Sequence, residues 1–186
     1  GVRPYIASQS TVTEGDTSYV VFDQAEKLVP GEKAYLVAEC TNMADDTDVS
    51  FTVTEGMPLL VSAGQNIPFL IGTTETTVFT AKVKDGYAAV QIQLQNPGTN
   101  KYDDWVSKVM QASGSDQEVE FQVKATIDSV DYLSTDVTKM VAPKVIQRIY
   151  HDGKISQEKY IQSLIKKVQF IYHDSSDTET DLGTFD

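Results

Sequence analysis

The sequence is poor in the residue types on which much protein chemistry depends. It holds one cysteine, two histidines and one tryptophan among 186 residues. A single cysteine excludes an intramolecular disulfide and a zinc site built from cysteines. Lys and Arg number 15 against 27 Asp and Glu, and the resulting net charge of −12 argues against binding to a phosphate backbone. No apolar run approaches the ~20 residues of a membrane-spanning helix, and no basic, apolar signal segment opens the sequence.

Sequence motifs of the common enzyme classes are also missing. The chain contains no G-x-S-x-G, no G-x-G-x-x-G, no Walker loop and no H-E-x-x-H. Cys40 lies in A-Y-L-V-A-E-C-T, where alternation places it on one strand face with Leu36 and Ala38. Because free cysteine is usually buried, we predict a small core residue there rather than a nucleophile. We therefore expect a protein that is not an enzyme and holds no cofactor.

What is present is a series of alternating segments typical of β-strands. Val119, Phe121 and Val123 alternate with polar residues, so one face of that strand is predicted to meet the core. Asp85-Gly86 joins two β-prone runs, which is the strongest short-range signal for a hairpin. Since no helical pattern separates the segments, the sequence predicts a mostly β fold, an antiparallel β-sandwich. A hairpin loop is expected at 42–48. The predicted strands are 18–22, 32–41, 48–54, 77–84, 87–95, 118–127 and 130–141.

A domain boundary is predicted near Pro143, because charge changes there. Residues 1–143 carry 9 Lys and Arg against 20 Asp and Glu, whereas residues 144–173 carry 6 against 2. We expect the sandwich over 1–143 and a small α+β appendage over 144–186. The acidic end stops on a strand-like stretch, which suggests a fragment of a longer protein. The expected parts of the appendage are a hairpin turning at Asp152-Gly153, a helix over 157–168 capped by Ser156, a strand over 168–174, and a segment at 181–186 that pairs back.

The tetrapeptide I-Y-H-D occurs twice in the appendage, and each copy holds one of the two histidines. K-V-I-Q-R-I-Y-H-D-G at 144–153 aligns with K-K-V-Q-F-I-Y-H-D-S at 166–175, an offset of 22 residues. Adjacent strand residues point to opposite faces, so neither copy alone can chelate a metal, although two copies brought together offer ligands for zinc or iron. The simpler interpretation is one type of strand end used twice. A third interpretation is that the two copies form a surface that contacts a partner. Its residues would be Tyr150, His151, Asp152, Tyr172, His173 and Asp174.

Two further groups of residues are candidates for ligand binding. Trp105, with Tyr102 and Tyr87, could stack on a sugar, although such a residue more often anchors a long loop on the core. The acidic run N-M-A-D-D-T-D at 42–48 lacks the spacing and central glycine of a calcium-binding EF-hand loop. We predict surface charge there rather than a calcium site.

Several of these segments together resemble a known family. G-E-K-A-Y-L-V-A-E-C-T-N-M-A-D-D-T-D-V-S-F-T-V at 31–53 resembles a bacterial Ig-like module with the approximate pattern G-E-x-V-x-L-x-V-E-T-x-N-M, a hairpin and T-V-x-F-x-V. T-A-K-V-K-D-G-Y-A-A-V-Q-I-Q-L at 80–94 and V-E-F-Q-V-K-A-T at 119–126 resemble its later strands. R-I-Y-H-D-G-K-I at 148–155 and F-I-Y-H-D at 170–174 resemble a segment that follows such modules in large multidomain bacterial proteins, similar to polymorphic toxins and injection-system cargo.

The resemblance implies an Ig-like sandwich used as a spacer, docking or display module. Its expected partners are other protein chains or domains of the same polypeptide, with no nucleic acid and no membrane span. The expected location is secreted or injection-system-associated, with the chain cytoplasmic before export. Cys40 stands where a small or hydroxyl residue is usual in the family. Two alternatives remain open: a carbohydrate-binding sandwich that uses Tyr102 and Trp105, and a metal-dependent hydrolase built on the two I-Y-H-D copies.

Overall fold

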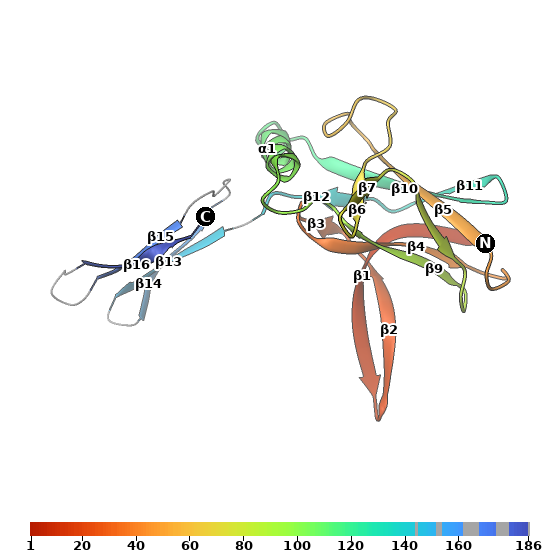
Figure 1. Ribbon diagram of the computed structural model, residues 1–186, viewed down its shortest axis with the longest axis horizontal. Helices are drawn as coiled ribbons and strands as arrows, with labels where there is room; N and C mark the ends of the chain where they lie inside the picture. Colours follow the sequence, from red (N-terminus) through yellow and green to blue (C-terminus); the bar gives the residue numbers. More distant parts are fainter. Residues whose placement is uncertain (144, 152–153, 162–167, 174–178, 186) are drawn as a thin grey trace. The chain divides into compact units, whose positions relative to one another are not determined.

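The computed structural model describes residues 1–143, 145–151, 154–161, 168–173 and 179–185, with side chains described for 1–143. The chain divides into two compact units, Gly1–Ala142 and Pro143–Asp186, one residue from the boundary expected from the change in charge. The first unit is a mostly β structure with two six-stranded sheets (Figure 1). No helix in the described part of the chain is long and apolar enough to cross a membrane.

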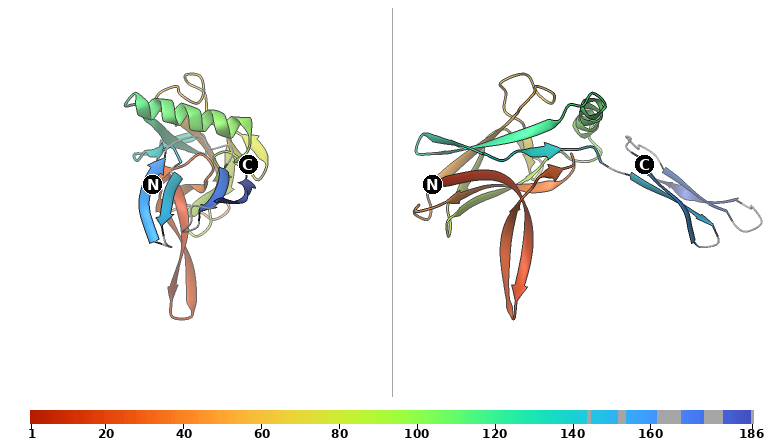
Figure 2. Two further views of the ribbon diagram at one scale, coloured as in Figure 1. Left: turned by 90° about the vertical axis from the view of Figure 1, so that its left-hand side faces the viewer. Right: turned by 180° about the vertical axis from the view of Figure 1, so that it is seen from behind.

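The first sheet has the strand order β2-β1-β4-β9-β6-β7, and all neighbouring strands in it are antiparallel. The β1–β2 hairpin projects well beyond the rest of the sheet in every view (Figures 1 and 2). The strands are β1 (Val2–Glu14), β2 (Thr17–Gln24), β4 (Lys33–Cys40), β6 (Phe69–Ile71), β7 (Thr74–Thr76) and β9 (Tyr87–Gln93).

The second sheet has the order β3-β12-β10-β5-β8, and β11 pairs with β10 beyond the end of β12. The β12–β3 pair is parallel and the others are antiparallel, so this sheet is mixed. The prediction of a mostly β, two-sheet fold is therefore confirmed, whereas the expectation of purely antiparallel sheets is wrong at one pair. The strands are β3 (Lys27–Leu28), β5 (Asp48–Glu55), β8 (Phe79–Lys82), β10 (Val119–Ile127), β11 (Val130–Leu133) and β12 (Thr138–Met140).

The core of the first unit comes from the alternating apolar positions of both sheets. Val119, Phe121 and Val123 are each 1% exposed, as their alternation predicts. Cys40 joins the same cluster with Leu36 and Ala38, so the prediction of a small core residue is confirmed. Burial raises the pKa of the Cys40 thiol, because desolvation penalises the thiolate.

Two predicted connections differ from those observed. Residues 42–48 do not close a hairpin, because β4 belongs to the first sheet and β5 to the second. Asp85-Gly86 does form the expected tight turn, with positive φ at both residues and hydrogen bonds in both directions between the backbones of Lys84 and Tyr87. Beyond that bridge, however, β8 joins the second sheet and β9 the first. Turn chemistry fixes the local reversal, whereas burial of the flanking strands decides which sheet each joins.

A helix was not expected between 95 and 118, yet α1 spans Asn100–Gly114. The hydroxyl of Thr99 caps it by accepting from the backbone N–H of Tyr102, and four residues of one face are buried: Trp105, Val106, Val109 and Ala112. These positions follow the 3.6-residue period, so the signal was present in the sequence. The interpretation of Trp105 as an anchor on the core is confirmed, but its element is a helix rather than a long loop.

The second unit contains two antiparallel hairpins, β13 (Val145–His151) with β14 (Lys154–Ile161), and β15 (Val168–His173) with β16 (Glu179–Phe185). The expected strand at 168–174 agrees with β15 over 168–173, and the expected pairing back of 181–186 agrees with β16 over 181–185. Residues 174 and 186 lie outside the described part of the chain. The helix predicted over 157–168 is wrong at both of its ends, because 157–161 pair with β13 as part of β14 and Val168 begins β15. Residues 162–167 lie outside the described part of the chain.

Candidate functional site

The two I-Y-H-D copies occupy equivalent backbone positions. Tyr150 and His151 end β13, and Tyr172 and His173 end β15, so each copy closes the first strand of its own hairpin. This agrees with one strand end used twice. Asp152 and Asp174 lie outside the described residues, as do the side chains of the other four. The metal site and the partner-contact surface predicted from these residues remain predictions.

The sugar-stacking site predicted at Trp105 is wrong for the described structure. Trp105 is 1% exposed and meets the ring of Phe69 edge-on, with centroids 6.1 Å apart. A stacking platform needs an open ring face, and this indole has none to offer. Tyr102 is half-buried on α1, whereas Tyr87 lies on β9 and its ring packs 6.3 Å from that of Phe22.

The acidic loop between β4 and β5 is held by internal bonds. The Asp45 carboxylate accepts from the backbone N–H of Asp85 at 3.0 Å. Lys82 Nζ donates to the Asp48 carboxylate at 2.8 Å and to the backbone carbonyl of Asp46 at 3.3 Å. No group of three potential metal-ligating side chains occurs in the described part of the chain. The Asp45 carboxylate therefore fastens the loop to the β8–β9 turn, and the Asp48 carboxylate ties the start of β5 to Lys82 at the end of β8.

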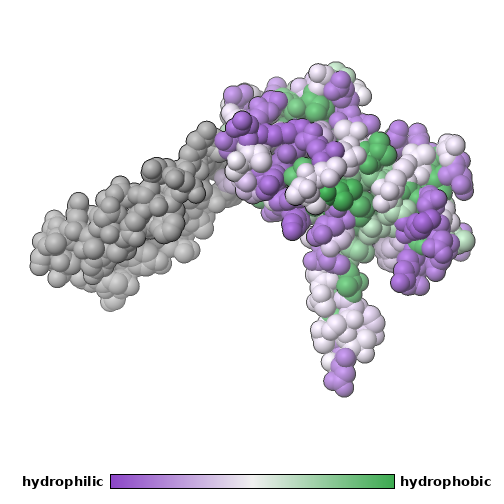
Figure 3. All heavy atoms as spheres, in the orientation of Figure 1, coloured by the Kyte–Doolittle hydropathy of each residue, from purple (hydrophilic) through white to green (hydrophobic). Residues whose placement is uncertain are grey.

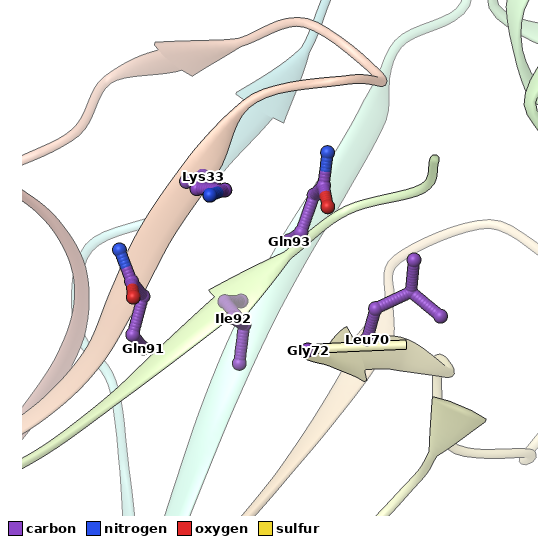
Figure 4. A pocket seen from close by; sticks show the side chains of 6 residues that line it. All are labelled: Lys33, Leu70, Gly72, Gln91, Ile92 and Gln93. Atoms are coloured by element: carbon purple, nitrogen blue, oxygen red, sulfur yellow. The ribbon is translucent and has the colours of Figure 1, made fainter. Parts of the chain in front are cut away.

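A small hollow opens at the surface of the first sheet where β6 separates from β9 (Figure 4). The two strands share one register pair, Leu70 with Gln93, so their backbones diverge beyond it. The hollow has a volume of about 100 Å³. Sites for small molecules usually measure roughly 300–1,000 Å³, so this one is too small for a substrate of ordinary size. Its lining residues are Lys33, Leu70, Gly72, Gln91, Ile92 and Gln93.

The most distinctive feature of the first unit is the outer part of the β1–β2 hairpin, residues 8–23, which we call the arm. Every residue from Ser8 to Val20 is exposed, although the segment is regular strand on both sides of the turn. The turn is Gly15-Asp16, and Gly15 has φ +62°, as the first position of a type II′ turn requires. A lone two-stranded hairpin is marginally stable in water, so a long one exposed on both faces suggests a contact element.

Both backbone edges of the arm are open. β1 pairs with β4 only over Val2–Ala7, and from Ser8 to Glu14 its one partner is β2. β2 is the terminal strand of its sheet, and within the described part of the chain no strand pairs with its outer edge. Because alternate residues of an antiparallel strand turn their N–H and C=O groups to either side, each edge offers free hydrogen-bonding groups.

The arm carries apolar side chains on both faces. Val12 and Tyr19 are cross-strand partners on one face, and Thr11 and Val20 are partners on the other. Val12, Tyr19 and Val20 are 44%, 51% and 58% exposed, respectively. Apolar groups are usually withdrawn from water, so their exposure on a regular ribbon marks a surface that another chain can cover.

The base of the arm is packed firmly against the outer face of the first sheet. The ring of Phe22 lies 5.3 Å from that of Tyr35, whose hydroxyl donates to Gln9 Oε1 at 2.8 Å. Nearby, the Tyr5 ring is covered by the Arg3 guanidinium at 4.4 Å. Burial raises the pKa of Tyr5 to about 12. These contacts fix where the arm leaves the sheet.

The arm carries charge only at its tip and near its base. It has no Lys or Arg, and its carboxylates are Glu14 and Asp16 at the tip and Asp23 near the base. Asp23 accepts a 3.0 Å hydrogen bond from the Ser10 hydroxyl. The visible face of the arm is mostly of intermediate hydropathy, and hydrophilic colour gathers at its tip (Figure 3). Neutral side chains therefore cover the middle of both strands.

Sequence reasoning predicted only the 18–22 part of this hairpin. Gly15-Asp16 between two β-prone runs is a hairpin signal that would have identified the rest. β1 was not predicted, because its outer half is exposed on both faces and shows no alternation of apolar and polar residues.

Comparison with protein-family models and with curated proteins gives no match to this sequence.

Proposed function

We propose that this chain is a non-enzymatic protein-interaction module, an Ig-like β-sandwich belonging to a bacterial secreted or injection-system-associated protein. The observation that carries the proposal is the arm: a regular two-stranded ribbon with both faces exposed and both edges open. Strand edges bind other chains by adding a strand, and exposed apolar side chains supply the contact. The toxin-associated setting rests on the resemblance of the strand and I-Y-H-D segments to known multidomain proteins.

Several features of the described residues favour binding over catalysis. The hollow at β6 and β9 has a volume of about 100 Å³, and Trp105 is enclosed in the core. Two carboxylates of the acidic loop are engaged within the unit, Asp45 with the β8–β9 turn and Asp48 with Lys82 on β8. The Ig-like character agrees with two packed sheets of mainly antiparallel strands, and the parallel β3–β12 pair is a departure from that pattern.

The test is site-specific photo-crosslinking in bacteria that produce the full chain. A benzophenone amino acid replaces Tyr19 on the arm, and in a matched control it replaces Val130, which is 50% exposed on β11. Protein adducts of defined mass from position 19, identified by mass spectrometry and absent at position 130, are expected. The absence of adducts at position 19, or equal labelling at both positions, would overturn the arm as the contact element.

The non-enzymatic part is tested by elemental analysis of the purified chain and of a His151→Ala, His173→Ala double variant. We expect no stoichiometric metal in either protein. A zinc or iron content that matches the chain stoichiometrically and disappears in the double variant would instead favour the metal-dependent hydrolase.

A further inference from the structure

We infer that the partner of the arm is a second copy of this chain, bound by antiparallel pairing of β2 with β2 across a two-fold axis. The inference rests on the proposed function and names its partner. It would join two β1–β2 hairpins into a four-stranded sheet. Three observations carry it: the open edge of β2, the composition of that strand and the placement of its charges.

The edge of β2 is better suited to strand pairing than the edge of β1. Tyr19, Val20, Val21 and Phe22 are β-branched or aromatic, the residue types that pack best on pleated surfaces. The outer half of β1 has only three residues of these types, Thr11, Val12 and Thr13, and its remaining residues are Ser, Gln and Glu. Native edges usually carry a lysine, a proline or a bulge that blocks pairing, and β2 has neither lysine nor proline and pairs with β1 in unbroken register.

Charge selects a second copy over a strongly charged partner. The chain has a net charge of −12, so two copies repel over most of their surface. The central residues of β2, Ser18 to Phe22, carry no charge. The outer part of the hairpin projects away from the acidic sheets, whereas Phe22 packs at its base (Figure 1). A basic partner would find few carboxylates to pair with here, whereas an uncharged strand edge fits another uncharged strand edge.

The register follows from symmetry. An antiparallel pair of identical strands must place one residue opposite itself, because adjacent pairs alternate between two hydrogen-bonding types. If the two-fold axis passes between the two Val20 residues, Thr17 pairs with Asp23 of the second copy, and Ser18 pairs with Phe22 of the second copy. No like charges then face each other, and each copy's Asp23 meets a neutral threonine. A parallel, in-register pairing would set Asp23 against Asp23.

The test is sedimentation of the full chain over a range of concentrations. We expect a concentration-dependent dimer that becomes a monomer in Val20→Glu, where two carboxylates would meet on the axis. It should also become a monomer when residues 10–13 and 18–21 are removed together. This deletion takes four facing pairs from the arm, so the turn and the side-chain alternation are kept. Thermal melts show whether each variant remains folded.

Two substitutions at one exposed position sharpen the test. Thr17→Lys sets an ammonium opposite the second copy's Asp23, and Thr17→Asp sets a carboxylate there. Because every substitution occurs twice in a symmetric dimer, we expect the dissociation constant to fall by about tenfold in the first and rise by about tenfold in the second. The same two substitutions at Thr13, which lies on β1 away from the proposed interface, should change the dissociation constant little.

A chain that stays monomeric at every soluble concentration would overturn the inference. The inference would also be overturned by a dimer whose dissociation constant is unchanged by the substitutions at positions 17 and 20, or is changed by those at position 13. The outcomes also separate the two proposals. A monomeric chain whose Tyr19 position crosslinks to a different protein keeps the proposed function and refutes self-pairing. If position 19 gives no adduct and the chain forms a dimer that does not depend on β2, both the proposed function and the self-pairing are refuted.

Discussion

The hydroxyl of Thr138 donates a 2.6 Å hydrogen bond to the backbone carbonyl of Ala25, 113 residues away in the sequence. Thr138 is 2% exposed and Ala25 is 7% exposed, so neither group has ready access to water. The bond lies beside the parallel β3–β12 pair, where the backbone N–H of Lys139 donates to Glu26 and that of Val141 to Leu28. One side chain therefore helps to fasten the last strand of the first unit to its beginning.

Thr138→Val should lower the free energy of unfolding by about 1–3 kcal/mol, because a buried carbonyl would lose its donor while the side-chain volume is nearly kept. Urea unfolding measures the loss. The control is Thr126→Val, which removes a 2.7 Å bond to the Asp131 carboxylate on the exposed surface. The two variants should differ clearly, and equal effects would contradict the role given to burial.

Trp105→Ala should destabilise the first unit by about 3–5 kcal/mol, the range for removing a large aromatic residue from a core. Tyr19→Ala on the arm should change stability by less than ~0.5 kcal/mol. Chemical unfolding of both variants checks the contrast. A mild effect at Trp105 would mean that its ring is not enclosed, and would bring the sugar-stacking hypothesis back.

Glu55→Ala should loosen the loop that follows β5. The two carboxylate oxygens of Glu55 accept from the backbone N–H groups of Leu60 and Val61 at 2.9–3.0 Å. Removal leaves half-buried donors unpaired, at a cost of about 1–3 kcal/mol. Faster amide hydrogen exchange at 59–61 is the local readout. Glu75→Ala, which removes an exposed ion pair with Lys101, is the control and should leave that exchange unchanged.

Tyr5 should make the folded chain sensitive to strong alkali. Burial raises the pKa of Tyr5 to about 12 from the ordinary value of 10, so between these values the unfolded chain loses the proton and the folded chain keeps it. The stabilisation is complete below pH ~10 and is lost as the pH rises toward ~12. Tyr5→Phe should flatten this decline, as measured by urea unfolding across the alkaline range. Tyr19→Phe should retain it, and a decline unchanged in Tyr5→Phe would contradict the assignment.

Alternation made most strands of the first unit predictable, since Val119, Phe121 and Val123 each meet the core where the period of two places them. The sheet that each strand joins was not predictable from its turns. Asp85-Gly86 reverses the chain equally well between strands of one sheet or of two, and only long-range burial separates these cases. The helix α1 was missed because its few apolar positions lie between strong strands, although Thr99 and Gly114 mark its ends.

The candidate site was harder to predict than the fold, because an interaction surface has no fixed residue chemistry. Two histidines and a tryptophan attracted attention as rare residues, yet Trp105 serves the core. The arm consists mainly of ordinary Ser, Thr and Val residues, and what distinguishes it is its exposure and its open edges. Those properties depend on where β4 stops pairing with β1, at Ala7, which local sequence does not reveal.

The pairing of β12 with β3 has a consequence for the order of folding. Residues 139–140 lie against residues 27–28, so the strand that completes the second sheet is nearly the last part of the unit to be synthesised. Contacts between such distant segments form slowly, since a long loop must close before they yield any stabilisation. During translation the first sheet can therefore assemble early, while β3 stays without its strand partner until residues 139–140 have left the ribosome.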